Sequence, residues 1–124
     1  MSELVLVEDA DGIRTIRFNR PEKKNALTRA MYSAAATALV TGDADPAIKV
    51  FIIAGAGGIF TAGNDMVDFM QAPPALDGTE IPPVGQFMQA LLKITKPVVA
   101  AVDGLAIGIG VTMLMHCDLV YASP

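Results

Sequence analysis

The sequence has a single cysteine, Cys117, so it cannot form an intrachain disulfide, which agrees with a reducing compartment. It also lacks a long apolar run. Glycines or charged residues interrupt every apolar stretch before the ~20 residues that a membrane-spanning helix needs. The first residues, MSELVLVEDADG, have neither the basic region nor the apolar region of a secretory signal peptide. We therefore expect a cytoplasmic protein.

Basic residues are few as well. The 124 residues include nine Lys and Arg against 13 Asp and Glu, a net charge of −4, which disfavours a nucleic-acid-binding module. Six of the nine basic residues nevertheless lie between positions 14 and 29. Two interpretations stay open for this basic window. It is either the exposed face of a strand followed by a solvated loop, or a local binding site for a small phosphorylated ligand.

Hydrophobic residues are abundant, at 52% of the chain, which is enough for one domain with a buried core spanning residues 1–124. Residues 4–8 and 13–18 flank Asp11-Gly12 and predict a β-hairpin. Thr28 is a suitable N-cap for a helix that ends near Gly42. Further strands are predicted over 49–55, 97–102 and 117–123, and helices over 64–70 and 84–94. This alternation predicts an α/β fold with a largely parallel sheet, in which the strands over 49–55 and 97–102 are buried on both faces. Residues 71–83, with four prolines, predict an exposed and mobile loop.

Glycines begin the next predicted helix, in the stretch GLAIGIGVTMLMHCD over residues 104–118. Their spacing matches neither the G-x-G-x-x-G pattern nor a P-loop. Glycine does let another group approach the backbone closely, and the first N–H groups of a helix have no acceptor within it. A second turn, Gly63-Asn64, comes before the helix predicted at 64–70. The two turns are either an oxyanion hole or tight turns whose N–H groups bind water, and spacing alone does not separate these alternatives.

Three motifs, NRPEKKNAL, FTAGNDM and AVDGLAIGIGVTMLMHCDLVYAS, resemble the successive signatures of the crotonase family of enoyl-CoA hydratases and isomerases. The resemblance covers nearly the whole chain. It implies the crotonase (ClpP/crotonase-like) fold, a spiral of ββα units of which this chain would form the N-terminal half. It also implies assembly as a homotrimer or a dimer of trimers.

The resemblance assigns roles to particular positions. The backbone N–H groups of Asn64 and Ile109 would form the oxyanion hole for an acyl-CoA thioester. The basic window would meet the phosphates of CoA, which is part of the substrate, so that no separate cofactor and no metal is expected. The substrate-binding positions would be Lys24, Asn25, Ala26, Ala62, Gly63, Asp65, Met66, Val67, Gly108 and Thr112.

Thr112 departs from the hydratase pattern, which has a glutamate at this position. A hydroxyl with a pKa far above 7 cannot replace a carboxylate as general base, so double-bond isomerisation is favoured over hydration. The pieces GND, MY (Met31-Tyr32) and GIGVT also resemble the isomerases of the family. An enoyl-CoA hydratase and a non-catalytic acyl-CoA-binding protein stay open as alternatives.

The catalytic carboxylate is expected beyond Pro124, because family members are longer and the present chain looks truncated. Asp65 and Asp68 are the acids nearest to the site in the sequence, and Asp65 is expected to cap a helix. His116 and Cys117 lie among apolar residues and are expected to be packed side chains.

Overall fold

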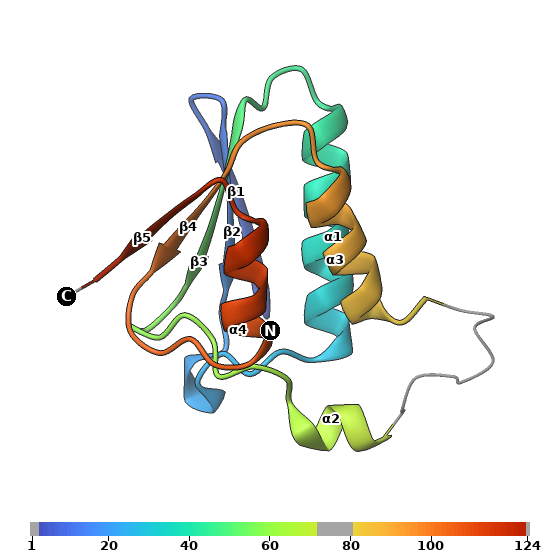
Figure 1. Ribbon diagram of the computed structural model, residues 1–124, viewed down its shortest axis with the longest axis vertical. Coiled ribbons are helices and arrows are strands. Elements are labelled where there is room, and N and C mark those ends of the chain that lie inside the picture. The colour runs from blue at the N-terminus through green and yellow to red at the C-terminus, as the bar shows by residue number, and fades with distance from the viewer. Residues whose placement is uncertain (1–2, 72–80, 124) are drawn as a thin grey trace.

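The computed structural model describes residues 3–71 and 81–123 and contains a sheet of five strands in the order β1-β2-β3-β4-β5 (Figure 1). The first two strands are antiparallel, and β2 to β5 run parallel to one another. The predicted hairpin and the largely parallel sheet are thus confirmed. The strands are β1 (Val5–Ala10), β2 (Ile13–Phe18), β3 (Val50–Gly55), β4 (Val98–Val102) and β5 (Leu119–Ala122).

The helices follow the predicted positions with two differences: the short 3-10 helix η1 lies where a loop was expected, and the helix expected from the 104–118 stretch is divided into α4 and the 3-10 helix η2. At the N-terminus of the longest, the Thr28 hydroxyl accepts a hydrogen bond from the N–H of Met31 at 3.2 Å, as expected for an N-cap. Residues 72–80, most of the predicted loop over 71–83, lie outside the described residues, so its predicted mobility stays a prediction. The helices are η1 (Pro21–Lys23), α1 (Arg29–Ala44), α2 (Met66–Gln71), α3 (Pro83–Lys93), α4 (Ile109–Thr112) and η2 (Met113–His116).

The core lies between the sheet and helices α1, α3 and α4, which are on the same side of the sheet (Figure 1). Four phenylalanines, from β2, β3, the segment after β3, and α3, are fully buried there: Phe18, Phe51, Phe60 and Phe87. Helix α1 packs closely on β3 at Gly42, where an added Cβ would lie 2.7 Å from the Phe51 ring. This contact holds α1 against the N-terminal part of β3, whereas the loops of the candidate site follow the C-terminal ends of β2, β3 and β4.

The prediction that two strands are buried on both faces is wrong for the face of the sheet opposite these helices. The apolar strands over 49–55 and 97–102 were expected to be buried on both faces, but Ile52 and Val99 are only half-buried and Ala101 is exposed. All of β5 is exposed. The physical reason is that the described helices cover a single face, so side chains of the other face have no described element above them. None of these helices is long and apolar enough to cross a membrane.

Candidate functional site

The loop between β2 and α1 is held together by Asn25, whose side chain is completely buried. Its amide nitrogen donates hydrogen bonds to the carbonyl oxygens of Ala56 (2.9 Å) and Ile59 (2.7 Å), and its Oδ1 accepts one from the N–H of Arg20 (2.7 Å). Asn25 and Lys24 both have φ near +55°, a conformation that Asn tolerates better than most residues. The predicted ligand-binding side chain of Asn25 therefore holds the loop, while that of Lys24 is exposed.

Three segments distant in sequence run side by side next to this loop: residues 24–27, 61–65 and 105–107. Isolated bridges pair Leu27 with Asn64 and Thr61 with Ala106. The backbone hydrogen bonds that join the segments are Ala62 N–H to Lys24 O (3.0 Å), Leu27 N–H to Gly63 O (2.7 Å), Asp65 N–H to Leu27 O (2.9 Å) and Ile107 N–H to Thr61 O (3.0 Å). The structure thus brings together the two glycine-containing turns that the sequence singled out.

Gly63 and Gly108 touch where these turns meet. Both have positive φ, +92° and +61°. A Cβ on Gly63 would lie 2.9 Å from the carbonyl oxygen of Ile107 and 3.9 Å from the Cα of Gly108, and a Cβ on Gly108 would lie 4.0 Å from the Cα of Gly63. Glycine is required at Gly63 by both its conformation and its surroundings. The backbones of the two turns are therefore too close for a side chain at position 63.

The residues that follow these glycines, Asn64 and Ile109, each carry an unpaired backbone donor. Among the described residues, neither backbone N–H donates a hydrogen bond. The N–H groups on both sides of Asn64 are occupied, Gly63 by Thr61 Oγ1 (3.1 Å) and Asp65 by Leu27 O (2.9 Å), and those after Ile109 are occupied as well, Gly110 by Ile107 O (3.0 Å) and Val111 by Gly108 O (2.9 Å). The N–H of Gly108, directly before Ile109, likewise donates no hydrogen bond to a described residue. An unpaired N–H retains a strong preference for an acceptor, so the pair can receive an oxygen atom of a ligand.

The carboxylates beside this pair are already engaged. Asp65 accepts a hydrogen bond from the N–H of Asp68 at 2.9 Å, the predicted capping role, and pairs with Arg20 at 2.6 Å. Both interactions hold the pKa of the Asp65 carboxyl below its usual value of 3.8, and the hydrogen bond from the Asp68 N–H has the larger effect. Asp68 accepts hydrogen bonds from both the N–H and the Nε of Arg29, at 2.8 and 3.2 Å. Both acids therefore fix α2 against α1 and the Asn25 loop.

Three of the six basic residues in the window form ion pairs of the same kind. Arg14 pairs with Asp9 at 2.8 Å, while Arg20 and Arg29 hold the two acids described above. Lys23 and Lys24 are exposed and make no ion pair with any described residue. The carbonyl of Lys24 accepts the Ala62 hydrogen bond, so these lysines lie close to the turn that carries Asn64. Arg17 on β2 also makes no ion pair with a described residue, but it is half-buried, so the exposed Lys23 and Lys24 are the better candidates for binding a phosphate.

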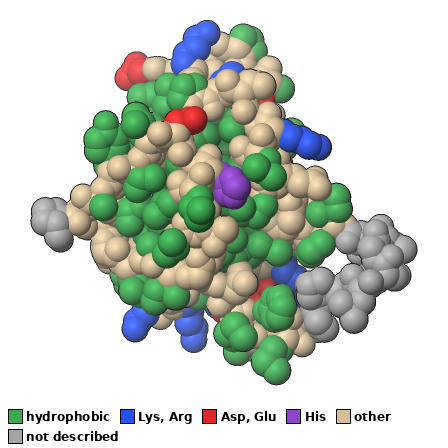
Figure 2. Space-filling view, viewed as in Figure 1, with side chains coloured by type: hydrophobic (Ala, Val, Ile, Leu, Met, Phe, Trp, Pro, Cys, Tyr) green, Lys and Arg blue, Asp and Glu red, His purple; other side chains and the backbone are tan. Residues whose placement is uncertain are grey.

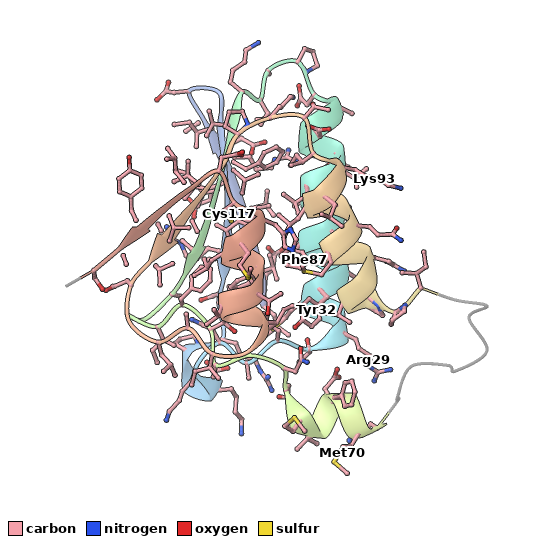
Figure 3. All side chains as sticks on the ribbon, viewed as in Figure 1. Arg29, Tyr32, Met70, Phe87, Lys93 and Cys117 are labelled. Carbon is pink, nitrogen blue, oxygen red and sulfur yellow. The ribbon has the colours of Figure 1, made fainter. Side chains whose placement is uncertain are left out.

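The remaining predicted positions differ in their exposure. Ala26 and Ala62 are half-buried, Met66 and Val67 are exposed on α2, and Thr112 is exposed at the end of α4. On the face shown in Figure 2, hydrophobic side chains gather over α2. The exposed hydrophobic side chains of α2 are Met66, Val67, Phe69 and Met70, and Figure 3 shows Met70 pointing away from the rest of the molecule.

Of the two side chains expected to be packed, Cys117 contacts the core, and the packing of His116 stays a prediction. His116 is half-buried in η2. Cys117 packs against the core, and its thiol donates a hydrogen bond to the carbonyl of Met113 at 3.4 Å. Burial raises the pKa of the Cys117 thiol to about 11. Among the residues that the structure describes, no group of His, Cys, Asp and Glu could hold a metal ion.

Sequence reasoning missed two contacts of the site. The Arg20–Asp65 ion pair is one, and a hydrogen bond from the Tyr32 hydroxyl to Oδ1 of Asn64 is the other. The sequence offered one signal for the second contact: the Met31-Tyr32 pair resembles the isomerases of the family, but this resemblance assigns no role to Tyr32. Both contacts join residues that no local pattern connects.

The fold and the site together define an α/β protein whose candidate site consists of backbone donors at two glycine turns. Comparison with known proteins narrows this class. The sequence model of the family described as Enoyl-CoA hydratase/isomerase matches residues 8–124, and the chain belongs to this family.

Curated relatives include the Enoyl-CoA delta isomerase 2 of Homo sapiens, 37% identical with 98% of this chain and 32% of the relative covered. The Crotonyl-CoA hydratase of Syntrophomonas wolfei is 35% identical, with 94% and 45% covered. Among solved structures, Pseudomonas aeruginosa OdaA is 53% identical with a TM-score of 0.91, and 98% of this chain and 48% of that one are covered. The predicted crotonase fold is confirmed, and the chain spans a third to a half of the length of these relatives.

Proposed function

We propose that the protein containing this chain acts on enoyl-CoA thioesters, and that the N–H groups of Asn64 and Ile109 bind the thioester oxygen. The observation that carries the proposal is the pair of N–H groups on Asn64 and Ile109, which donate no hydrogen bond to a described residue and follow two glycines, Gly63 and Gly108, whose backbones lie close together. Because neither glycine has a side chain, a carbonyl group can reach these donors. Donors placed in advance stabilise negative charge that develops on that oxygen, typically by a factor of ~10²–10³ in rate for each donor.

The reaction that we favour is movement of a double bond. A base removes a proton from C2 of a 3-enoyl-CoA, and the released electron pair forms a dienolate whose negative charge lies on the thioester oxygen. Return of the proton at C4 leaves the double bond between C2 and C3. This sequence needs one carboxylate, whereas the resembling hydratases use an additional glutamate at the position of Thr112. The naming of relatives as enoyl-CoA delta isomerases supports this preference.

The base itself is proposed to lie outside residues 1–124. Asp65 and Asp68, the acids next to the donors in the sequence, are bound to Arg20 and Arg29. The lowered pKa of Asp65 makes its carboxylate a weak base, and the Asp68 carboxylate is already occupied by two hydrogen bonds from Arg29. The relatives are longer than this chain, so residues from elsewhere in the whole protein have room to supply the base.

Lys23 and Lys24 are proposed to bind the phosphates of the CoA nucleotide. They are exposed, unpaired within the described residues and close to the Asn64 turn. Exposed charges are screened by salt, so binding is expected to weaken as the salt concentration rises. Calorimetry with acetoacetyl-CoA tests this, and equal affinities for the wild type and a Lys23→Ala, Lys24→Ala variant would exclude these two lysines. The homotrimer or dimer of trimers implied by the resemblance is proposed as well, and light scattering checks it.

A proline at position 109 tests the oxyanion hole. Ile109 is the first residue of α4, where proline fits the helix and removes only an N–H that is unpaired. Ile109→Ala is the matched control, because it shortens the side chain and keeps the N–H. In the whole protein that contains this chain, Ile109→Pro should lower kcat by ~10²–10³ relative to Ile109→Ala. A folded Ile109→Pro variant as active as Ile109→Ala would exclude this donor.

The choice of reaction is tested in the same protein with two substrates. We expect faster isomerisation of a 3-enoyl-CoA than hydration of a 2-enoyl-CoA, and Thr112→Glu should raise hydration. Faster hydration by the wild type would show that the protein is a hydratase. Tight binding of acetoacetyl-CoA without turnover of either substrate would identify an acyl-CoA-binding protein instead.

A further inference from the structure

A hydrogen bond from the core reaches the residue that carries one of the proposed oxyanion donors. Tyr32 lies near the N-terminus of α1 and is 4% exposed. Its ring packs against Phe87 of α3, with centroids 5.8 Å apart and planes tilted by 48° (Figure 3). Its hydroxyl donates a hydrogen bond to Oδ1 of Asn64. The side chain of Asn64, although exposed, is thereby attached to the packed interior between α1 and α3.

We propose that Tyr32 is a positioning residue that fixes the direction of the Asn64 N–H, an inference that rests on the proposed function. The peptide groups on either side of Asn64 are each held by one hydrogen bond to Leu27. The residue before it, Gly63, has φ of +92° and no side chain that could limit its rotation. Both of these bonds run to the same residue, Leu27. The Tyr32 bond adds a third point of attachment, through the side chain.

Packing against Phe87 does not explain why residue 32 has a hydroxyl group. A phenylalanine would fill the same space against Phe87, whereas a buried hydroxyl is unfavourable unless it is hydrogen-bonded. Burial raises the pKa of the Tyr32 hydroxyl, so it stays protonated and able to donate at neutral pH. The only acceptor that it meets among the described residues is Asn64 Oδ1. The hydroxyl therefore acts on the Asn64 turn.

The test compares two ligands in the wild-type protein and a Tyr32→Phe variant. Acetoacetyl-CoA forms an enolate whose oxygen would bind the two N–H groups, whereas free CoA has no acyl oxygen. We expect the affinity for the enolate, followed by its near-ultraviolet absorbance, to fall about five- to tenfold, the effect of one neutral hydrogen bond. The affinity for CoA should stay the same. A purely structural role of Tyr32 would weaken both ligands equally and overturn the proposal.

The Tyr121→Phe variant is the matched control, because it removes the hydroxyl of the other tyrosine, which is exposed on β5. It should bind both ligands like the wild type. Asn64→Ala keeps the backbone N–H and removes the acceptor of the Tyr32 bond. It should show the same fall as Tyr32→Phe, and the double variant should show no further fall, because the two changes remove one interaction. Additive effects would mean that Tyr32 acts by another route.

The outcomes also separate this inference from the proposed function. If the wild type binds the enolate no more tightly than CoA, the oxyanion hole itself is wrong and Tyr32 has nothing to position. If the wild type prefers the enolate and Tyr32→Phe keeps that preference, only the role of Tyr32 is wrong. Should Tyr32→Phe fail to fold, Asn64→Ala alone decides, because an undiminished preference for the enolate would also refute the proposal.

Discussion

A single methyl group at position 63 should disturb both the fold and the proposed oxyanion hole. Gly63 has φ of +92°, and a Cβ there would lie 2.9 Å from the carbonyl oxygen of Ile107. Gly58 offers a matched control, because its φ is +74° while the nearest heavy atom to an added Cβ is 3.9 Å away. Gly58→Ala therefore introduces the backbone strain alone, and Gly63→Ala introduces the strain together with a clash.

The two variants should differ by the energy of that clash. A left-handed backbone conformation is unfavourable for alanine by ~1–2 kcal/mol, which is the loss of stability expected for Gly58→Ala. Overpacking adds ~1–3 kcal/mol, so Gly63→Ala should lose ~2–5 kcal/mol. To relieve the contact, the two turns must move apart, and the N–H groups of Asn64 and Ile109 must separate. A displacement approaching 1 Å can lower catalysis by ~10²-fold, and we expect enolate affinity to fall by at least about tenfold.

Urea denaturation measures the first effect, and titration with acetoacetyl-CoA measures the second. Gly58→Ala should keep the affinity of the wild type for the enolate. Equal stabilities of the two variants would show that the turns do not touch at Gly63. If Gly63→Ala folds and binds the enolate like the wild type, the distance between the two turns does not set the oxyanion hole, and the reasoning is refuted.

Three further predictions concern the surroundings of the site. Asp65→Asn removes the ion pair with Arg20, and because the pKa of Asp65 is lowered on folding, its carboxylate stabilises the fold above pH ~3.8. The difference in Tm between wild type and Asp65→Asn should therefore be large at pH 7 and shrink as the pH falls below that value; a constant difference would contradict the assignment. Asn25→Ala leaves three backbone partners unpaired and should lose ~3 kcal/mol or more in urea denaturation, against ~1 kcal/mol for Asn19→Ala, whose side chain makes one hydrogen bond. Cys117 should react with iodoacetamide far more slowly than free cysteine at pH 8, with the rate rising toward pH 11, and fast alkylation at pH 8 would mean that its thiol is not buried.

Local features of the sequence were sufficient to predict the strands of the sheet. The apolar run over 49–55, the Asp11-Gly12 turn and the Thr28 cap are local signals, and each produced the expected element. The glycines after the strands likewise identified both turns of the site. They work as signals because a positive φ and a close backbone approach leave glycine as the only residue that fits.

The contacts that hold these turns could not be predicted. Tyr32 and Asn64 are 32 residues apart, and Arg20 and Asp65 are 45 apart, so no periodicity links them. The exposure of the outer sheet face was mispredicted for a related reason. An apolar run such as 98–102 shows that a strand has hydrophobic side chains on both faces, but only the packed structure shows which face the described helices cover.

The central claim, that the N–H groups of Asn64 and Ile109 bind a thioester oxygen, is tested most directly by nuclear magnetic resonance of these two amides. Selective ¹⁵N labelling of Asn, Ile, Asp and Gly allows a titration with acetoacetyl-CoA. The amide protons of Asn64 and Ile109 should shift downfield together, because each gains a hydrogen bond to a negatively charged oxygen. Those of Asp65 and Gly110, already bonded to Leu27 and Ile107, should move little. Saturation with ligand that leaves Asn64 and Ile109 unshifted would contradict the claim.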